Sequence, residues 1–177
     1  LGSDLNDTAG AIRSATLLLS SANGRNPNGL ANSSDQAGRN FMNHNATFML
    51  AIDPRTVNDS VYQKTIHFND FYFDDGHGSG PLGQVQLLGR VTAPILKTRV
   101  PLVPEIALNW ICRHAVDWYL VSEDLPRKES RVRLDGPQVI LEWRFSNMAA
   151  HHLLVKRVKE RMRAAGYPIL LSQLVHG

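Results

Sequence analysis

The stretch that decides the fold is residues 117–145, DWYLVSEDLPRKESRVRLDGPQVILEWRF. It contains three runs with strand character, at 117–123, 130–134 and 138–145, and the turn sequence Asp135-Gly136-Pro137 joins the last two. Strands in such quick succession pair antiparallel, because a parallel pair needs a long crossover connection. The stretch therefore predicts an antiparallel sheet.

Working outward from this stretch, the same patterns predict the remaining elements. Further strands are expected at 45–52, 63–73, 83–91 and 168–175, and helices at 9–22, 104–116 and 148–165. A proline-punctuated connection is expected at 94–104, and loops at 23–37 and 74–81. The helices are separated from the strand runs instead of alternating with them, so the sequence predicts an α+β fold, a mostly antiparallel sheet flanked by helices.

Two of the helices have apolar stripes that predict which face is buried. The stripe of the helix at 104–116 is Ile106, Leu108, Ile111 and Ala115, and that of the helix at 148–165 is Leu154, Val158 and Met162. Asn147 precedes the second helix and is expected to cap it.

Composition bounds the class of protein. The 177 residues are 43% hydrophobic and 20% charged, with a net charge of +3, which is typical of one globular domain with an attached fragment of another. The basic residues are spread along the chain, so no nucleic-acid partner is expected. Cys112 is the single cysteine, which excludes an internal disulfide and fits a cytoplasmic location. No apolar run reaches the roughly 20 residues of a membrane span, so none is expected.

Seven histidines raise the question of a metal site. His151 and His152 are adjacent on a predicted helix and point about 100° apart, which is a poor geometry for holding one ion. A structural or exposed role is expected for each, and no metal is predicted. Glu123 and Asp124 are either an acidic pair in which one pKa is raised or a strand end in water.

The N-terminal helix begins with small residues at Gly10 and Ala11, followed by Ser14. Unpaired backbone amides at a helix start attract anionic oxygens, which suits a cofactor phosphate or the edge of a flavin. Close packing against a strand is the alternative.

Several stretches carry a resemblance to a known family. The first is Gly10, Ala11, Ser14, Leu17, Leu18, Ser21 and Gly24, which resembles the second signature of the glucose–methanol–choline (GMC) family of FAD-dependent oxidoreductases, with departures at Ala15, Ala22 and Asn23. Residues 26–35 leading into 38–44 are similar to the family's turn from flavin domain to substrate domain. Residues 63–65 with 69–73, and residues 122–126 with 131–135, resemble the bacterial branch that oxidises sugars and alcohols.

The resemblance implies an organisation and a cofactor. Residues 1–44 would be the end of the FAD-binding domain with a crossover loop, and residues 45–177 the substrate-binding domain. Gly10, Ala11 and Ser14 would contact FAD. The further residues expected to shape the cofactor pocket without transferring a proton are Gly38, Arg39, Asn40, Asn43 and His44. A tight crossover held by asparagine hydrogen bonds is the alternative at these positions.

Substrate contact is expected at Asn69, Asp70 and Tyr72, beside Phe71. An aromatic surface with polar neighbours suits a sugar or polyol, whose C–H faces stack while its hydroxyls form hydrogen bonds. Alternation along a strand also sends half of its aromatics into the core, which is the competing interpretation.

Two motifs of the family do not occur in the sequence. These are the Gly-x-Gly-x-x-Gly turn that binds the flavin pyrophosphate and the C-terminal segment that carries the catalytic histidine. The expectation is therefore an internal part of an FAD-dependent enzyme that oxidises CH–OH groups by hydride transfer to flavin. It holds no catalytic residue, is inactive alone, and depends on the remaining FAD-domain segments of its parent. The alternatives are a non-enzymatic carbohydrate- or ligand-binding module and an inactive gene fragment.

Overall fold

The computed structural model describes residues 10–60 and 64–175, which divide into two compact units. Unit 1 is Leu1–Asn43 with Asp124–Ser146, and unit 2 is His44–Glu123 with Asn147–Gly177. The chain thus passes between the units three times. The first passage lies next to the boundary expected from the sequence, while 124–146 joins unit 1. Assignment of flavin and substrate domains to these parts stays a prediction.

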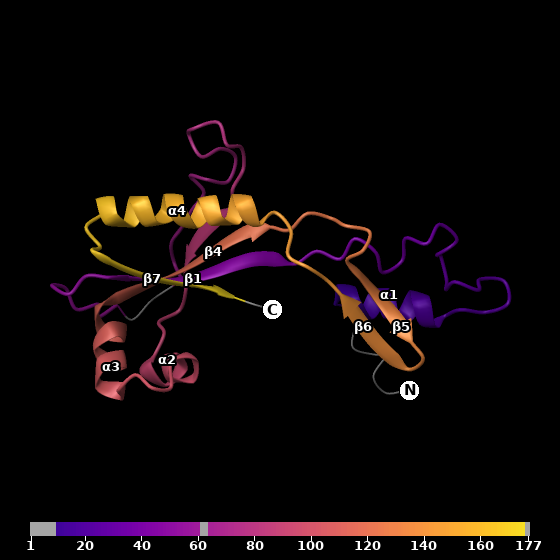
Figure 1. Cartoon of the computed structure of the whole chain (residues 1–177), viewed down its shortest axis with the longest axis horizontal. Coiled ribbons are helices and arrows are strands. Elements are labelled where there is room, and N and C mark those ends of the chain that lie inside the picture. The colour runs from indigo at the N-terminus through magenta and orange to yellow at the C-terminus, as the bar shows by residue number, and fades with distance from the viewer. Residues whose placement is uncertain (1–9, 61–63, 176–177) are drawn as a thin grey trace. The chain divides into compact units, whose positions relative to one another are not determined.

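The helices and strands of each unit are as follows (Figure 1). Unit 1 contains α1 (Ala11–Ser20), β5 (Arg131–Asp135) and β6 (Gln138–Glu142). Unit 2 contains β1 (His44–Ile52), β2 (His67–Phe68), β3 (Gln84–Leu87), α2 (Ala93–Arg99), α3 (Glu105–His114), β4 (Ala115–Glu123), α4 (Met148–Ala164) and β7 (Ile169–Val175).

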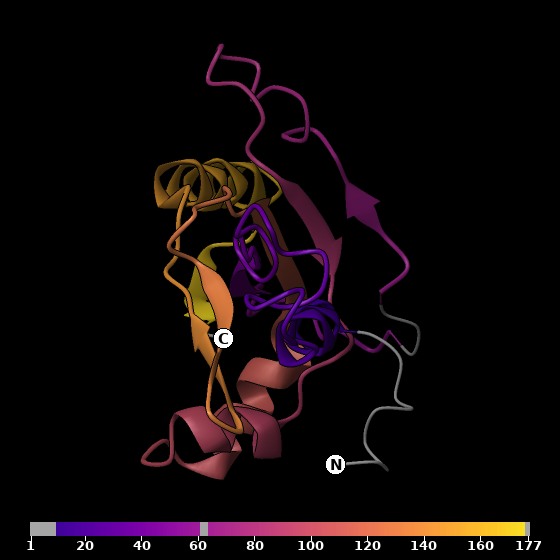
Figure 2. The same cartoon turned by 90° about the vertical axis from the view of Figure 1, so that its right-hand side faces the viewer.

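Unit 2 is built on a five-stranded sheet in the order β2-β3-β4-β1-β7, in which every neighbouring pair is antiparallel. Helix α4 covers one face, while α2 and α3 lie beyond the other (Figures 1 and 2). The α+β prediction is confirmed.

The main core lies between the sheet and α4. Leu154, Val158 and Met162 are buried there, so the stripe predicted for this helix is confirmed. They pack with Met49 and Trp118, among others, from the sheet. A smaller set on the opposite face joins Leu50, Ile52 and Ala115 to Leu96 and Ile111 of α2 and α3.

Unit 1 consists of a hairpin, α1 and a long loop. β5 and β6 pair from Arg131 with Glu142 to Asp135 with Gln138, so Gly136 and Pro137 form a two-residue turn. In the loop, Asn32 is 3% exposed; its side chain donates to the Asn28 carbonyl at 2.8 Å and accepts from the Ala37 amide at 2.9 Å. This loop is held by its own asparagines, which bond the backbone as they do in turns.

The structure differs from the sequence prediction between residues 63 and 73. Residue 63 lies outside the described residues, and strand pairing is confined to β2, His67–Phe68. The next residues form a turn in which the Tyr72 amide donates to the Asn69 carbonyl at 2.9 Å. Phe71 enters the core from this turn, and its carbonyl accepts from the amides of Leu82 and Gly83. The run was predicted as a strand because it is rich in aromatic residues, which are common in strands. In the structure the Phe71 ring enters the core from a turn instead.

Three further details around the helices were predicted incorrectly. The connection at 94–104 contains α2, since Pro94 sits in the first turn, where a helix needs no amide donor. Ile106 is 82% exposed, whereas Leu108 and Cys112 form the buried face of α3. Asn147 is in the left-handed region (φ 54°) and makes no capping bond; its side chain donates to the Glu123 carbonyl at 3.0 Å.

Candidate functional site

The start of α1 carries the first residues expected near a cofactor. Gly10 is the N-cap, in extended conformation, and its carbonyl accepts the Ser14 amide at 3.1 Å. No described side chain caps this end, and the first turn holds no acidic residue. None of the described atoms lies within 4 Å of where a Cβ on Gly10 would stand. Among the described residues, the space beside Gly10 at the start of α1 is therefore open.

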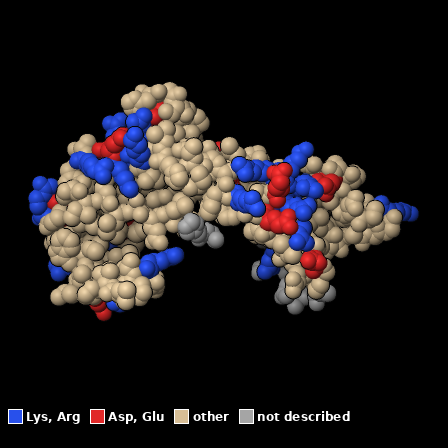
Figure 3. Space-filling view, in the orientation of Figure 1, with Lys and Arg blue, Asp and Glu red and all other residues tan. Residues whose placement is uncertain are grey.

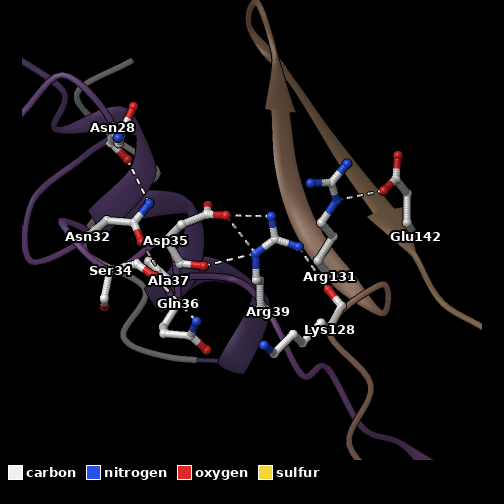
Figure 4. Close-up of polar contacts among 10 residues, drawn as sticks. All are labelled: Asn28, Asn32, Ser34, Asp35, Gln36, Ala37, Arg39, Lys128, Arg131 and Glu142. Carbon is white, nitrogen blue, oxygen red and sulfur yellow. Dashed lines mark hydrogen bonds and ion pairs between the residues drawn. The ribbon is translucent and has the colours of Figure 1, made fainter.

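Residues Gly38 and Arg39 are held tightly within unit 1, and Figure 4 shows the contacts of Arg39. Gly38 has φ +80°, its carbonyl accepts the Val132 amide at 2.7 Å, and a Cβ would overlap the Val132 carbonyl. The Arg39 guanidinium binds the Asp35 carboxylate at 2.5 Å and donates to the Lys128 carbonyl at 3.0 Å. These contacts give the guanidinium a structural role in fixing the loop to the segment before β5.

The other expected cofactor residues fall on both sides of a unit boundary. Asn40 is half-buried in the left-handed region (φ 58°), and the Asn43 amide lies 3.5 Å from Asp124 Oδ2. His44 is exposed and opens β1 opposite Glu123. Asn40 and Asn43 belong to unit 1 and His44 to unit 2, so their meeting in one flavin pocket stays a prediction.

Asp124 is a buried hydrogen-bonding centre that the sequence did not reveal. Its carboxylate accepts Trp143 Nε1 at 2.7 Å, the Ser146 amide at 2.8 Å and the Ser146 hydroxyl. Burial alone would raise the pKa of Asp124, but these hydrogen bonds outweigh it and hold the pKa below its ordinary value. A raised pKa in an acidic pair is therefore wrong at Asp124, which instead fixes the segment leading to Ser146.

The expected substrate residues Asn69, Asp70 and Tyr72 come together in one exposed turn of unit 2. The Tyr72 side chain is 48% exposed and meets Phe73 edge to face, with ring centroids 4.9 Å apart. Phe71 is 3% exposed and belongs to the core, as the competing interpretation held for one aromatic of this run.

A different set of side chains crosses the open face of the unit 2 sheet, opposite α4. In the order of the strands β2, β3, β4, β1 and β7 it is His67, Gln86, Tyr119, Phe48 and Gln173, and each member is the direct register partner of the next. We call this set the cross-strand row. Neighbours along the strands, such as Val85 and Met49, lie in the core with α4. Since side chains alternate between faces, the row points the other way.

The polar members of the row have no hydrogen-bonding partner within the part of the chain that the structure describes. The side chains of His67, Gln86, Tyr119 and Gln173 make no hydrogen bond to any other described residue. Gln86, Tyr119 and Phe48 are half-buried, while His67 and Gln173 are exposed. Adjacent strands are about 4.8 Å apart, so the five side chains of the row follow one another at regular intervals across the sheet.

An apolar hollow of about 600 Å³ opens on the same face, between the sheet and helices α2 and α3. Its lining residues are Phe48, Leu50, Leu88, Val91, Ile95, Leu96, Arg99, Val100, Val103, Leu108, Ile111, Tyr119 and residues 171–175. Arg99 is the charged member of this set. Phe48, Tyr119 and Gln173 belong to both the row and the hollow, so the two are continuous. In Figure 3 the visible surface over α2 and α3 carries few charges, whereas charges gather over α4.

A buried histidine ties α4 to the sheet on the opposite side. His151 is fully buried, with Nε2 2.8 Å from Thr47 Oγ1 and Nδ1 2.8 Å from Ser122 Oγ. Burial, with a smaller contribution from His152, lowers the pKa of His151 to about 4. Its neutral ring serves packing and hydrogen bonding, which is the structural role expected for it.

Asp117 is a second buried titratable group, on the face of β4 that turns toward α2. Its Oδ2 accepts the Val91 amide at 2.9 Å, while Oδ1 has no partner among the described residues. Burial raises the pKa of Asp117 to about 6, although the Val91 hydrogen bond and the charge of Arg90 act against the rise.

Two kinds of feature are absent from the described part of the chain. No three His, Cys, Asp or Glu side chains there are grouped so that they could hold a metal ion. None of the described helices is both long and apolar enough to cross a bilayer.

The cross-strand row was missed at the level of sequence. The alternation in 45–52, 83–91 and 117–123 does identify which residues share a face of each strand. The sequence does not show which residues of different strands lie side by side. This depends on the register between strands that are far apart in the chain, and the register is known only from the folded structure.

Unit 2 is thus an α+β unit whose antiparallel sheet carries the cross-strand row on the face opposite α4. No known protein family matches the chain in a family scan. Among curated proteins, the fructose dehydrogenase large subunit of Gluconobacter japonicus is 33% identical over 133 residues, which are 71% of this chain and 24% of the relative. The chain spans about a quarter of that relative's length. It is therefore distantly related to part of a dehydrogenase subunit.

Proposed function

We propose that the chain is part of an FAD-dependent oxidoreductase of the GMC type that acts on the CH–OH group of a sugar or alcohol. In this proposal unit 2 supplies the wall of the site on the substrate side, and the start of α1 with the segment 38–44 supplies flavin contacts. The observation that carries it is the open sheet face, where unpartnered polar side chains and aromatic rings form a surface next to an apolar hollow. Relation to a dehydrogenase subunit supports the reaction class.

The residues at the start of α1 fit an FAD phosphate. Space beside Gly10, uncapped amides from Ala11 and a first turn without acidic residues suit an anion. The Ser14 side chain is exposed one turn further along and would add a hydroxyl donor. When bound, FAD would supply the acceptor for the hydride that leaves the carbinol carbon.

The chain's own share of the chemistry is positioning. The row would fix the hydroxyls of the donor, and the apolar lining of the hollow would exclude water from one side of it. No catalytic residue is assigned within the chain, and the proton of the reacting hydroxyl would go to a histidine of the parent enzyme that this chain does not contain.

The second candidate function is a non-enzymatic ligand-binding module. It is favoured by one observation: the row and the hollow are formed by unit 2 residues alone. Such a module would bind a carbohydrate without a flavin.

One experiment separates the two. The whole protein encoded by the parent gene is purified and examined for visible flavin absorbance and for dye-linked oxidation of fructose and other polyols. The proposal is supported if the protein is yellow and oxidises these substrates, and if Tyr119→Leu lowers this activity without changing the flavin content. A colourless protein that binds sugar but reduces no dye overturns it in favour of the module.

A further inference from the structure

The cross-strand row and the apolar hollow are joined through three shared residues, Phe48, Tyr119 and Gln173. Two surfaces of opposite character therefore meet on one face of unit 2. A ligand that satisfies only one of them leaves the other in water. The question is which single ligand covers both.

The centre of the row is suited to a hydroxylated ring. Phe48 and Tyr119 are direct partners on β1 and β4, and each is followed by a glutamine, Gln173 on one side and Gln86 on the other. Paired aromatic rings provide a surface for the C–H face of a sugar. An amide offers two donors and an acceptor, so it can bind a hydroxyl group that both donates and accepts.

The half-buried polar groups also favour a ligand that binds them. Tyr119 and Gln86 are partly removed from water and have no hydrogen-bonding partner among the described residues. A purely apolar ligand over the row would bury these groups without hydrogen bonds, which is unfavourable. A ligand with several hydroxyls at the row avoids this cost.

The hollow requires the opposite chemistry. At about 600 Å³ it lies within the usual range of small-molecule sites. Leu50, Leu96 and Leu171 are typical of its lining, which offers an unbranched hydrocarbon chain apolar contact on the sheet side and on the α2 side. Moving such a chain from water into the hollow adds affinity with each methylene group.

We propose that the open face of unit 2 binds an amphiphilic carbohydrate, with its hydroxylated ring on the cross-strand row and its apolar substituent in the hollow. The inference rests on the proposed function in that it names the substrate class of the same face. Its test needs no flavin, so a failure of this inference can be told apart from a failure of the proposed function.

The test is binding of the 177-residue chain to hexyl β-glucoside, glucose and hexanol, each below any micelle-forming concentration, by titration calorimetry and saturation-transfer NMR. Hexyl β-glucoside should bind at least about tenfold more tightly than glucose, because its six carbons leave water. Saturation should reach both ring and alkyl protons. If glucose binds as tightly as hexyl β-glucoside, the role of the hollow is overturned. If hexanol binds as tightly as hexyl β-glucoside, the role of the row is overturned. If none of the three binds, both roles are overturned.

Matched variants locate the site. Gln173→Leu should weaken hexyl glucoside binding, whereas Gln138→Leu, a change at an exposed glutamine of β6 in unit 1, should not. Leu171→Trp should fill part of the hollow and reduce the preference for hexyl β-glucoside over glucose. Leu102→Trp, at a side chain that is 96% exposed, should leave this preference unchanged. Tyr119→Phe, which removes only a hydroxyl, provides a mild row variant.

Each variant is compared with the wild type by circular dichroism and thermal unfolding. Gln173 and Leu171 are exposed in the structure, so their replacement should preserve folding. Equal losses in the site variants and their controls would place the ligand elsewhere and overturn the proposal.

Discussion

Acidification should change the free energy of unfolding through two buried groups that act in opposite directions. The first is His151, whose pKa of about 4 lies below its ordinary 6.5 because burial disfavours the charged ring. The folded state prefers the neutral ring, so its contribution is complete above pH 6.5 and is lost as the pH falls toward 4. At about 1.4 kcal/mol per pKa unit, the loss is about 3 kcal/mol.

The second group is Asp117, whose pKa of about 6 lies above its ordinary 3.8 because the carboxyl is buried. The folded state prefers the neutral carboxyl, so this contribution is complete below pH 3.8 and is lost as the pH rises toward 6. The same conversion again gives about 3 kcal/mol. Between about pH 4 and 6 the two effects should nearly cancel in the wild-type protein.

Substitution of either group should make the effect of the other group on the free energy of unfolding measurable. His151→Gln should produce a protein that becomes more stable on acidification across this window, by about 3 kcal/mol, and Asp117→Asn should produce one that becomes less stable by a similar amount. His152→Gln, at the exposed neighbour, should change the profile only slightly, because His152 is the smaller contributor to the lowered pKa of His151. The slope with pH is the quantity compared, because each substitution also shifts the absolute stability.

The assay is urea unfolding followed by tryptophan fluorescence at a series of pH values from about 4 to 6.5. Groups common to all variants contribute equally and cancel in the comparison. A His151→Gln profile parallel to that of the wild type would refute the reasoning, since the buried ring would then not be the group that loses stability in acid.

The remaining predictions concern packing and reactivity. Gly38→Ala should destabilise unit 1 by about 2 kcal/mol or more, because a Cβ at this positive φ would overlap a backbone carbonyl. The loss is measured by Trp143 fluorescence during unfolding. Gly24→Ala, where a Cβ meets open space, should be neutral, and equal effects of the two substitutions would contradict this prediction. Leu154→Ala should cost about 3 kcal/mol in urea unfolding through a cavity under α4, and a cost below about 1 kcal/mol would show that the core collapses around the gap. Burial, aided by the charge of Asp117, raises the pKa of Cys112, so iodoacetamide should label it slowly in the native protein and rapidly in urea, whereas rapid native labelling would contradict its burial.

Local patterns predicted most of the elements, because each depends on neighbouring residues. The stripe of Leu154, Val158 and Met162 was sufficient to orient α4, and the turn at Gly136 was sufficient to place the β5–β6 hairpin. Helix α2 was missed because Pro94 was taken as a break, although proline is tolerated in a first turn. Ile106 was assigned to the buried face by spacing alone, whereas Leu108 and Cys112 pack against α2 instead. Ile111 is the α3 residue that packs against the sheet.

The candidate site was less predictable, because it depends on contacts between distant segments. The row becomes visible only when Phe48 is placed between Tyr119 and Gln173, which the register of three strands determines. The carboxylate of Asp124 appeared in the sequence as part of an acidic pair, and its donors from Trp143 and Ser146 appear only in the folded chain.

The position of β1 in the sheet has a consequence for synthesis of the protein. This early strand lies between β4 and β7, and Ala46 pairs with Val175, close to the last described residue. During translation one edge of β1 therefore stays without its partner until β7 has left the ribosome. Contacts of such long sequence separation form slowly, so this exposed edge is the site where premature association between nascent chains would begin.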